Sequence, residues 1–429
     1  MNKCTSKPRR IAFFGHFDGT NFGNESTLQA IVYHLRRIEP EAEVICICTG
    51  PQATTTSYHI AAIPIARTFL RSWAPSNPVG KLMRRICLGL GEPFRWLEGV
   101  VTLWRADILI VPGTGLLTDA YGLFSFGPYS LLRWSVIAKI CRCRLAFVSV
   151  GAGPIYSAAG RWCIRSVLSL ADFRSYRDAS TARYLRGIGI SADKDQVVPD
   201  LAFSLPKPAT SRRDSARGVI GIGVMEYAGK YTEERPNNAA HSSYLQTLAE
   251  TARWLLARGY NVRLLSGDRA DEHTRQAFLR LLRQRAPMDD GRRIVDEPIH
   301  TVEDLLSQIA ATDAVVATRY HNVLLSLLCE KPVISISFHH KCESLMAAMG
   351  MSDYCLKIGD LERDRLIQTF SRLEANADTL KLLIGDRIKE FRDTLDRQYH
   401  LLFNQMQHRR RTNASAAVIL PERSLGPSG

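Results

Sequence analysis

Residues 313–337 read DAVVATRYHNVLLSLLCEKPVISIS, and this stretch decides the fold class. A short apolar run, Asp313–Ala317, precedes a helical run, Val323–Cys329, and a second short apolar run follows at Pro332–Ser337. Apolar runs of this length are typical of buried strands, and strands that alternate with helices are typical of a parallel sheet. The stretch therefore predicts a strand–helix–strand unit.

The same alternation extends over most of the chain, and it breaks near Leu205–Arg217, where prolines and arginines interrupt it. We therefore expect an α/β protein with two Rossmann-like domains that face a central cleft. The first domain covers 1–205 and the second 206–405, with helices over Asp360–His400 packing the second domain, while 406–429 forms a disordered basic tail. The other expected strands are Arg10–Phe14, Ala42–Cys48, Ile108–Val111, Leu145–Val150, Val219–Val224 and Val262–Leu265, and a helix is expected over Glu25–Ile38.

Composition excludes several classes of protein. The chain has 429 residues, of which 45% are hydrophobic and 23% charged, a balance that excludes wholesale disorder. Because no apolar run approaches the ~18–20 residues that cross a bilayer, and none resembles a signal-peptide core, we expect a cytoplasmic protein. The ten cysteines form no Cys-x-x-Cys pair and no zinc-type cluster, so we expect reduced thiols and no metal.

The net charge of +14 is compatible with nucleic acid, an anionic membrane or an acidic substrate. Since no nucleic-acid-binding motif accompanies it, we expect no nucleic-acid partner. Segment 66–105 mixes arginines with Trp73, Trp96 and Trp104. Basic residues interleaved with aromatics are compatible with an interfacial helix on the inner face of a membrane. The simpler alternative, a pair of amphipathic helices that cover the first sheet, is the preferred interpretation of the sequence.

The strongest candidate site is the end of the strand quoted first. The strand delivers Arg319 and His321 to its carboxyl end, where the next helix begins, and a helix N-terminus favours a bound anion. Arg319 adds a fixed cation, and His321 adds a group that exchanges a proton near neutral pH. The alternative is an Arg–carboxylate bridge beside a buried, hydrogen-bonded histidine.

Two glycine-rich turns also follow expected strands. Gly113 and Gly115 flank Thr114, and Gly153 ends a similar turn. Ligands of open α/β sheets bind at such strand ends, but neither turn completes a dinucleotide fingerprint, so tight strand–helix geometry is the preferred explanation and ligand contact the alternative. Asp119 follows the first turn and is a candidate either for accepting a proton from a sugar hydroxyl or for capping the next segment.

Three further candidates carry charge. Arg177 precedes an expected helix and is a candidate anion ligand, while the adjacent Asp178 is a candidate N-cap. Lys341 lies beyond a strand end and is a candidate to face the cleft. Asp200, in Val198-Pro199-Asp200, is expected to form a turn.

Taken in order, these residues resemble the polysaccharide pyruvyl transferases. The matching pieces run over roughly residues 10–360, and the ordered set is more specific than any single piece. They are Gly19-Thr-Asn-Phe-Gly-Asn24-Glu25, Asp107–Asp119, Ser149–Pro154, Arg174-Ser-Tyr-Arg177-Asp178, Val198-Pro-Asp200, Thr318-Arg319-Tyr320-His321 and Lys331–Ile336 with Lys341 beyond.

The resemblance implies a fold like that of the GT-B glycosyltransferases and a reaction without metal or nucleotide cofactor. In that reaction the pyruvyl group of phosphoenolpyruvate is moved onto two hydroxyls of a sugar or glycan, which forms a ketal and releases phosphate. It also implies that Arg177, Arg319 and Lys341 bind the donor anion. His321 would then be the acid, and Asp119 would orient the acceptor hydroxyl or accept its proton.

The chain departs from the family pattern at Asn24, Thr114 and Tyr320. Tyr320 keeps the flanking Arg and His, so we retain it, together with Asn24, among the substrate-binding candidates. Two other functions remain open at this stage. One is a glycosyltransferase of the same architecture, which would need a ribose-binding carboxylate such as Glu297 or Glu303, and the other is a non-catalytic binding protein of an exopolysaccharide pathway. The sequence does not specify the acceptor, and a lipid-linked sugar is one of the candidates.

Overall fold

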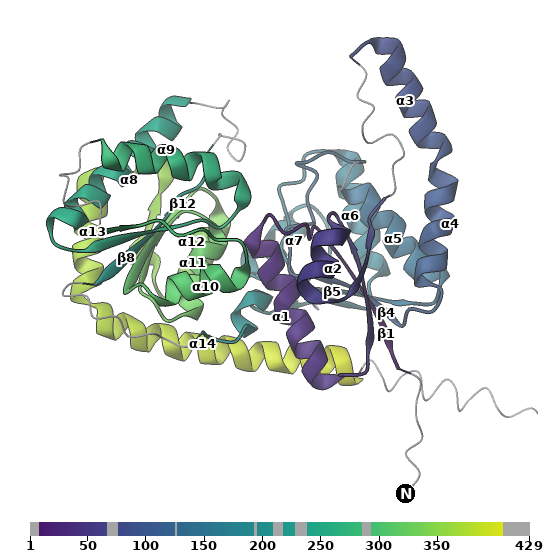
Figure 1. Cartoon of the computed structure of the whole chain (residues 1–429). Coiled ribbons are helices and arrows are strands. Elements are labelled where there is room, and N and C mark those ends of the chain that lie inside the picture. Colours follow the sequence, from purple (N-terminus) through teal and green to yellow (C-terminus); the bar gives the residue numbers. More distant parts are fainter. Residues whose placement is uncertain are drawn as a thin grey trace, which may run out of the picture.

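The computed structural model describes residues 8–66, 76–124, 127–192, 195–208, 218–227, 238–284 and 293–405. Two parallel sheets form the centres of two α/β domains that lie side by side (Figure 1). The first sheet has the strand order β3-β2-β1-β4-β5-β6-β7 and the second has the order β10-β9-β8-β11-β12-β13. The α/β class with two Rossmann-like domains is therefore confirmed.

In the first domain, apolar strands alternate with helices that cover both faces of the sheet. The strands are β1 (Arg10–Gly15), β2 (Glu43–Cys48), β3 (Ala61–Pro64), β4 (Ile108–Pro112), β5 (Arg144–Val150), β6 (Phe173–Tyr176) and β7 (Gln196–Val197). The helices are α1 (Phe22–Ile38), α2 (Pro51–Tyr58), α3 (Pro78–Leu90), α4 (Glu92–Leu103), α5 (Pro128–Ile140), α6 (Ala158–Leu170) and α7 (Ala179–Gly187).

The second domain repeats this alternation with a smaller sheet. Its strands are β8 (Val219–Gly223), β9 (Asn261–Leu265), β10 (Ile294–Val295), β11 (Ala314–Ala317), β12 (Val333–Ser337) and β13 (Cys355–Lys357). Its helices are α8 (Asn238–Ala257), α9 (Glu272–Arg283), α10 (Val302–Ala310), α11 (Tyr320–Leu328), α12 (His340–Ala348), α13 (Arg363–Ala375) and α14 (Ala377–His400).

Helix α1 begins three residues before the helix expected from the sequence. Asn21 is the reason, because its side chain accepts hydrogen bonds from the backbone N–H groups of Gly23 and Asn24 and so caps the first turn. The cap brings the N-terminus of α1 forward to the junction between the domains, where the backbone N–H of Phe22 donates to the carbonyl of Gly267, 3.2 Å away.

Helix α14 does not pack on the second domain alone, so the expectation for Asp360–His400 is wrong for its second half. The helix runs under both domains (Figure 1), and its last turns contact the first domain. Gln398 donates to the hydroxyl of Ser149 at 3.0 Å, and the Tyr399 ring stacks on His34 with 4.3 Å between ring centroids. This crossing helix ties the two sheets together.

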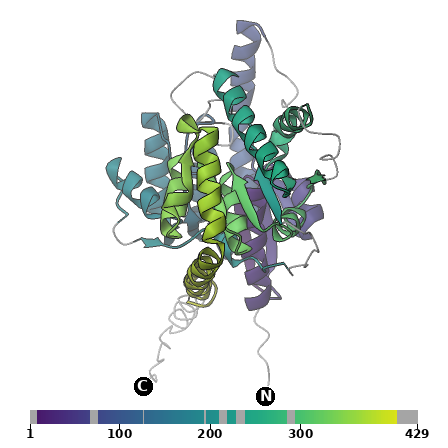
Figure 2. The same ribbon diagram turned by 90° about the vertical axis from the view of Figure 1, so that its left-hand side faces the viewer.

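Helices α3 and α4 form an arm that projects from the first domain in both views (Figure 1 and Figure 2). Helix α4 packs on α5 through Gly99 and Leu103, which are buried, whereas α3 extends beyond the body of the domain. Residues 67–75, including Trp73, lie outside the described residues. Trp96 packs against the core of the first domain instead of facing outward.

No helix among the described residues is long and apolar enough to cross a membrane. The tail at 406–429 likewise lies outside the described residues.

Candidate active site

The strand–helix–strand unit quoted first places two functional groups at the junction between the domains. Strand β11 ends at Ala317 beside β8, at the point where the strand order of the second sheet reverses, which is where open α/β sheets bind ligands. Arg319 occupies the N-cap position of α11, and its side chain makes no capping hydrogen bond. His321 lies in the first turn of α11 with 17% of its side chain exposed.

Three buried polar atoms meet at this junction without a hydrogen-bond partner among the described residues. They are Nε of Arg177, Oδ2 of Asp200 and Nε2 of His321. Arg177 follows β6 in the first domain, and its Nη1 lies 3.6 Å from Oδ2 of Asp200. The same carboxylate oxygen lies 3.8 Å from Nε2 of His321. Nε of Arg177 also lies 3.5 Å from Asp178, so each of the three atoms is at ion-pair distance from an opposite charge but makes no hydrogen bond. Because buried polar groups are nearly always hydrogen-bonded, the junction is a candidate ligand site.

Lys341 adds a further positive charge beside His321. It lies in the first turn of α12, and its ammonium group sits 5.6 Å from the centre of the Tyr320 ring, while the Arg177 guanidinium lies 4.8 Å from the same ring. Among the described residues no ion pair joins Lys341 to a carboxylate. Burial, and then the charge of Arg177, lower the pKa of Lys341 to about 8.

The imidazole of His321 is neutral in this environment. Burial, followed by the charges of Arg177, Lys341 and Arg319, holds the pKa of His321 well below its usual range. Burial acts in the opposite direction on a carboxyl group, so the pKa of Asp200 is raised although Arg177 lies beside it. The cations around the ring thus disfavour an imidazolium. Carboxylates lie beside two of these cations: Asp178 and Asp200 are within 3.6 Å of Arg177, and Asp268 and Asp271 are within 3.7 Å of Arg319.

Two glycines allow these side chains to come close to the backbone. The His321 ring packs on Gly23 in the first turn of α1, where a Cβ would overlap Nδ1 and Cε1 of the ring. The Arg177 guanidinium packs on Gly151, where a Cβ would lie 2.7 Å from Nη2. Both positions therefore exclude any larger residue in this arrangement.

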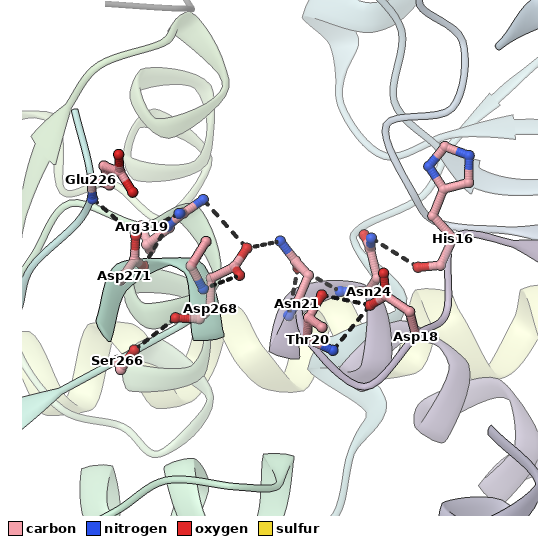
Figure 3. A network of polar contacts seen from close by, with 12 residues as sticks. His16, Asp18, Thr20, Asn21, Asn24, Glu226, Ser266, Asp268, Asp271 and Arg319 are labelled. Atoms are coloured by element: carbon pink, nitrogen blue, oxygen red, sulfur yellow. Dashed lines mark hydrogen bonds and ion pairs between the residues drawn. The ribbon is translucent and has the colours of Figure 1, made fainter. Parts of the chain in front are cut away.

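Arg319 belongs to a polar network that joins the domains (Figure 3). Its Nε and Nη2 donate to the two carboxylate oxygens of Asp271, at 2.8 and 2.6 Å. Its Nη1 lies 3.7 Å from Asp268, which in turn accepts a 2.7 Å hydrogen bond from the side chain of Asn21 in the first domain. An Arg–carboxylate bridge is thus present, and the role of Arg319 as an anion ligand stays a prediction.

The two glycine-rich turns of the first domain lie against each other. The backbone N–H of Gly153 donates to the carbonyl of Leu117 at 2.8 Å, and Gly153 has a φ of 86°, which favours glycine. A Cβ at Gly113 would touch Thr27 at 3.0 Å, whereas a Cβ at Gly115 would meet open space. Packing therefore explains two of the three glycines and leaves Gly115 unexplained.

Asp119 anchors the turn that starts α6. Its carboxylate accepts hydrogen bonds from the backbone N–H of Tyr156 at 2.7 Å and from the backbone and hydroxyl of Ser157 at 2.8 and 2.6 Å. Partial burial by itself would raise the pKa of Asp119, but these hydrogen bonds outweigh it and hold the pKa below its usual value. Among the described residues, Asp119 forms no hydrogen bond or ion pair with Arg177 or His321.

The remaining predicted residues have structural partners. The Asn24 side chain donates to the carbonyl of His16 at 3.0 Å and holds the loop after β1. Asp178 caps α7, as its hydrogen bond to the backbone N–H of Thr181 at 2.6 Å shows. Of the carboxylates considered for ribose binding, Glu297 pairs with Arg263 and Glu303 accepts a hydrogen bond from Gln29.

The sequence did not single out Gly23 or Gly151 by themselves, and it assigned Asp200 only to a turn. Asp200 does cap the short turn Leu201–Ser204, but its second oxygen faces Arg177 and His321. A separate cavity of about 400 Å³ lies between β13 and α13, with Arg365 and Arg372 in its lining, and no predicted site residue reaches it. No group of three or more potential metal ligands occurs in the described part of the chain.

Fold and site together define a two-domain α/β protein of the GT-B type, with charged side chains from both domains at the junction between them. The chain belongs to the polysaccharide pyruvyl transferase family, whose model matches residues 21–340. The amylovoran biosynthesis protein AmsJ of Erwinia amylovora is 20% identical over 416 residues, which cover 89% of this chain and 96% of AmsJ.

Two solved structures illustrate the likeness of fold. A glycosyltransferase from Rickettsia africae superposes with a TM-score of 0.58 at 10% identity, over 93% of this chain and 100% of the other. The UDP-GlcNAc 2-epimerase from Methanocaldococcus jannaschii superposes with a TM-score of 0.54 at 9% identity, over 84% of this chain and 92% of the other. At these identities the likeness concerns the fold.

Proposed function

We propose that this protein transfers the pyruvyl group of phosphoenolpyruvate to two hydroxyls of a polysaccharide or its precursor, forming a cyclic ketal and releasing phosphate. The observation that carries the proposal is the meeting of Arg177, Lys341 and His321 at the junction between the domains, where three buried polar atoms make no hydrogen bond among the described residues. Membership of the pyruvyl transferase family supports it.

The donor carries a phosphate and a carboxylate, so its site needs at least two cations. Lys341 and Arg177 lie over the same Tyr320 ring, and Lys341 has no carboxylate partner among the described residues. The start of α11, which has no side-chain cap, adds a favourable partial charge. Arg319 joins this set if its guanidinium shares its bonds between Asp271 and the donor.

His321 supplies the acid. In the free protein its imidazole is neutral, because neighbouring cations and burial lower its pKa. A bound anion offsets those cations, so the pKa of His321 rises and the ring takes up a proton as the donor binds. The imidazolium then protonates the methylene carbon of the donor, and the central carbon becomes an oxocarbenium-like centre that a sugar hydroxyl attacks.

The remaining steps complete the ketal. The C–O bond to phosphate breaks, the central carbon becomes electrophilic again, and the second hydroxyl attacks it. Of the two hydroxyl protons, one replaces the proton that His321 delivered to carbon, and the other leaves with phosphate or solvent. Asp119 has a lowered pKa and three hydrogen bonds in place, which suits orientation of the acceptor better than proton abstraction.

The acceptor side is the first domain, where the turns with Gly113, Gly115 and Gly153 meet beside Asp119. Gly115 is exposed, and a Cβ there would meet no other atom within 4 Å, so an acceptor could approach the backbone at this point. A cytoplasmic location is supported by the free state of the nine cysteines in the described part of the chain.

A nucleotide-sugar glycosyltransferase is the second candidate, because structural neighbours include a glycosyltransferase and a UDP-sugar epimerase. It is less well supported, since Glu297 and Glu303 are already paired with Arg263 and Gln29.

Calorimetric titration of phosphoenolpyruvate into the full chain tests the proposal without knowledge of the acceptor. Lys341→Met is the variant of choice, because removing this cation leaves no carboxylate among the described residues unpaired. We expect saturable binding by the wild type and at least tenfold weaker binding by the variant, in line with the ~1.5–3 kcal/mol of a charge-assisted hydrogen bond. Lys357→Met, at the exposed last position of β13, is the matched control and should bind as the wild type does.

A panel of nucleotide sugars is titrated in parallel. Binding of a nucleotide sugar with no binding of phosphoenolpyruvate would replace the proposal by the glycosyltransferase. Equal binding of phosphoenolpyruvate by the wild type and Lys341→Met would move the donor site elsewhere. A non-catalytic protein would bind glycans and release no phosphate, with or without His321.

A further inference from the structure

The arm formed by α3 and α4 carries apolar side chains on one continuous face. On α3 these are Val79, Leu82, Met83, Ile86 and Leu90, each between 53% and 70% exposed. Their spacing of three and four residues places them in a single stripe along the helix. Of the side chains of α3 that the structure describes, none is buried, so this face has no cover from the described part of the chain.

The stripe continues onto α4. Gly91, which links the two helices, has helical backbone angles, so the axis runs on with little change in register. Phe94, Leu97, Val101 and Trp104 follow at the same spacing and are 61–75% exposed. The opposite side of α4 is the one that packs on the domain, because a Cβ at Gly99 would lie 2.5 Å from Ile137. We call these nine outward residues of the arm the apolar stripe.

The charges of the arm match an anionic surface. Residues 76–91 contain Lys81, Arg84 and Arg85 and no acidic residue. Helix α4 contains two acidic residues, Glu92 and the half-buried Glu98. Glu92 faces the domain, where it accepts a hydrogen bond from Tyr129 at 2.9 Å and lies 3.4 Å from Arg133. The free part of the arm is therefore purely cationic, within a chain of net charge +14.

We propose that this arm is a lipid-binding element that lies in the interface of a membrane rich in anionic lipid, with the apolar stripe in the acyl region and the basic residues among the headgroups. Interfacial helices have this pattern: an exposed apolar stripe that includes Trp and Phe, and charged residues that are Lys and Arg. A contiguous apolar surface of this extent on a soluble domain needs a partner.

A membrane is favoured over a protein as the partner that covers the apolar stripe. The stripe lies on a helix that projects away from the domain (Figure 1 and Figure 2), so the apolar residues are presented along a ridge and not in a groove. A ridge with a purely cationic free helix suits a soft anionic layer, into which apolar side chains sink ~5–10 Å. The arm would thus hold the site of the first domain close to acceptors attached to lipid, a role that adds to the proposed function but does not depend on it.

Vesicle co-sedimentation of the full chain tests the proposal. Binding to vesicles of phosphatidylcholine that contain about 30% phosphatidylserine is compared with binding to vesicles of phosphatidylcholine alone. We expect binding to the anionic vesicles to be at least tenfold tighter, and to weaken as salt rises from about 0.05 to 0.5 M. The double variant Leu82→Glu/Ile86→Glu should lose binding at least tenfold, because both substitutions put charge into the stripe.

The matched control is Leu382→Glu, since Leu382 is a 74% exposed leucine on α14, far along the chain from the arm. It should bind vesicles like the wild type, and calorimetric donor binding should be the same in all variants. Unchanged vesicle binding by the double variant would overturn the proposal. A second result would also overturn it: the wild type does not bind vesicles and forms an oligomer, while the double variant is a monomer. That result would assign the apolar stripe to self-association.

Discussion

Oδ2 of Asp200 lies 3.8 Å from Nε2 of His321, and among the described residues neither atom has a hydrogen-bond partner. The carboxylate comes from the segment that ends the first domain and the imidazole from the first turn of α11 in the second. The pair is therefore made by the packing of two domains, and it is positioned to stabilise an imidazolium when a proton arrives at His321.

Asp200→Asn tests that relationship. The substitution keeps the size of the side chain and removes its charge, so the pKa of His321 in the donor complex should fall. Titrations of phosphoenolpyruvate at pH 7.5 in buffers of different ionisation enthalpy measure the protons taken up on binding. We expect uptake of about one proton by the wild type and clearly less by the variant.

Asp178→Asn is the control for this experiment, because Asp178 also faces Arg177 and Asn can still cap α7. Its proton uptake should equal that of the wild type. Identical uptake in all three proteins would show that Asp200 does not act through His321.

Gly23→Ala should disturb the domain junction. The new methyl group would overlap the His321 ring, and such overpacking costs about 1–3 kcal/mol. We expect the free energy of unfolding in urea to fall by that amount and donor binding to weaken. Gly187→Ala, at the end of α7 where a Cβ meets open space, should leave both within error or gain slightly in stability. A Gly23→Ala protein as stable as the wild type would contradict the close contact.

Donor affinity should depend on Lys341 above neutral pH. Burial lowers the pKa of Lys341 to about 8, so in the free protein its charge is lost as pH rises through that value. The dissociation constant of phosphoenolpyruvate should therefore increase above pH 8, by up to about tenfold per pH unit. Lys341→Arg keeps its charge, and its dissociation constant should stay flat to about pH 9.5. A wild type that is flat over the same range would remove Lys341 from the donor site.

His339→Asn should reduce the decrease in the free energy of unfolding that occurs as the pH is lowered. Burial, and then Lys341, lower the pKa of His339 from 6.5 to about 3. Between these values the unfolded chain binds a proton that the folded chain does not, so stability is present above pH 6.5 and falls as pH decreases below it. Asn removes the titration and still serves as N-cap of α12. Thermal melting at pH 7 and pH 5 should show a smaller drop for the variant, and an equal drop would refute this assignment.

Asp271→Ala should be strongly destabilising. Asp271 is fully buried and binds Arg319 through both oxygens, so the substitution removes both hydrogen bonds of the guanidinium to this carboxylate, a change that costs about 3–5 kcal/mol. Glu390→Gln, which breaks an exposed pair with Arg387, should cost at most ~1 kcal/mol. Urea unfolding of both variants gives the comparison, and similar small losses would mean that the Arg319 bridge contributes little.

Much of the fold could be predicted because its central strands are long enough to show a pattern. The expected strand at Leu145–Val150 is β5, Arg144–Val150, and the one at Pro332–Ser337 is β12, Val333–Ser337. The strands missed were short or at the edges of the sheets, where partial exposure breaks the apolar run. They are β3, β6, β7, β10 and β13, which have two to four residues each.

The candidate site divides in the same way. Arg319 and His321 stood out because a strand end and a helix start adjoin in the chain, which is local information. Asp200, Gly23 and Gly151 did not, since each acquires its role from a side chain far away in the chain: His321 for the first two and Arg177 for the third. No local pattern contains that contact.

The amino-acid sequence by itself determined the α/β class, the order of the central strands along the chain, the basic amphipathic character of the arm and the cations that an anion site would use, because each depends on residues close together in the chain. Tertiary structure alone decided that α14 crosses to the first domain, that Arg319 is held by Asp271, and that Asp200 faces His321. Those outcomes depend on how two independently patterned domains pack, and packing is set by the shape and burial of whole surfaces.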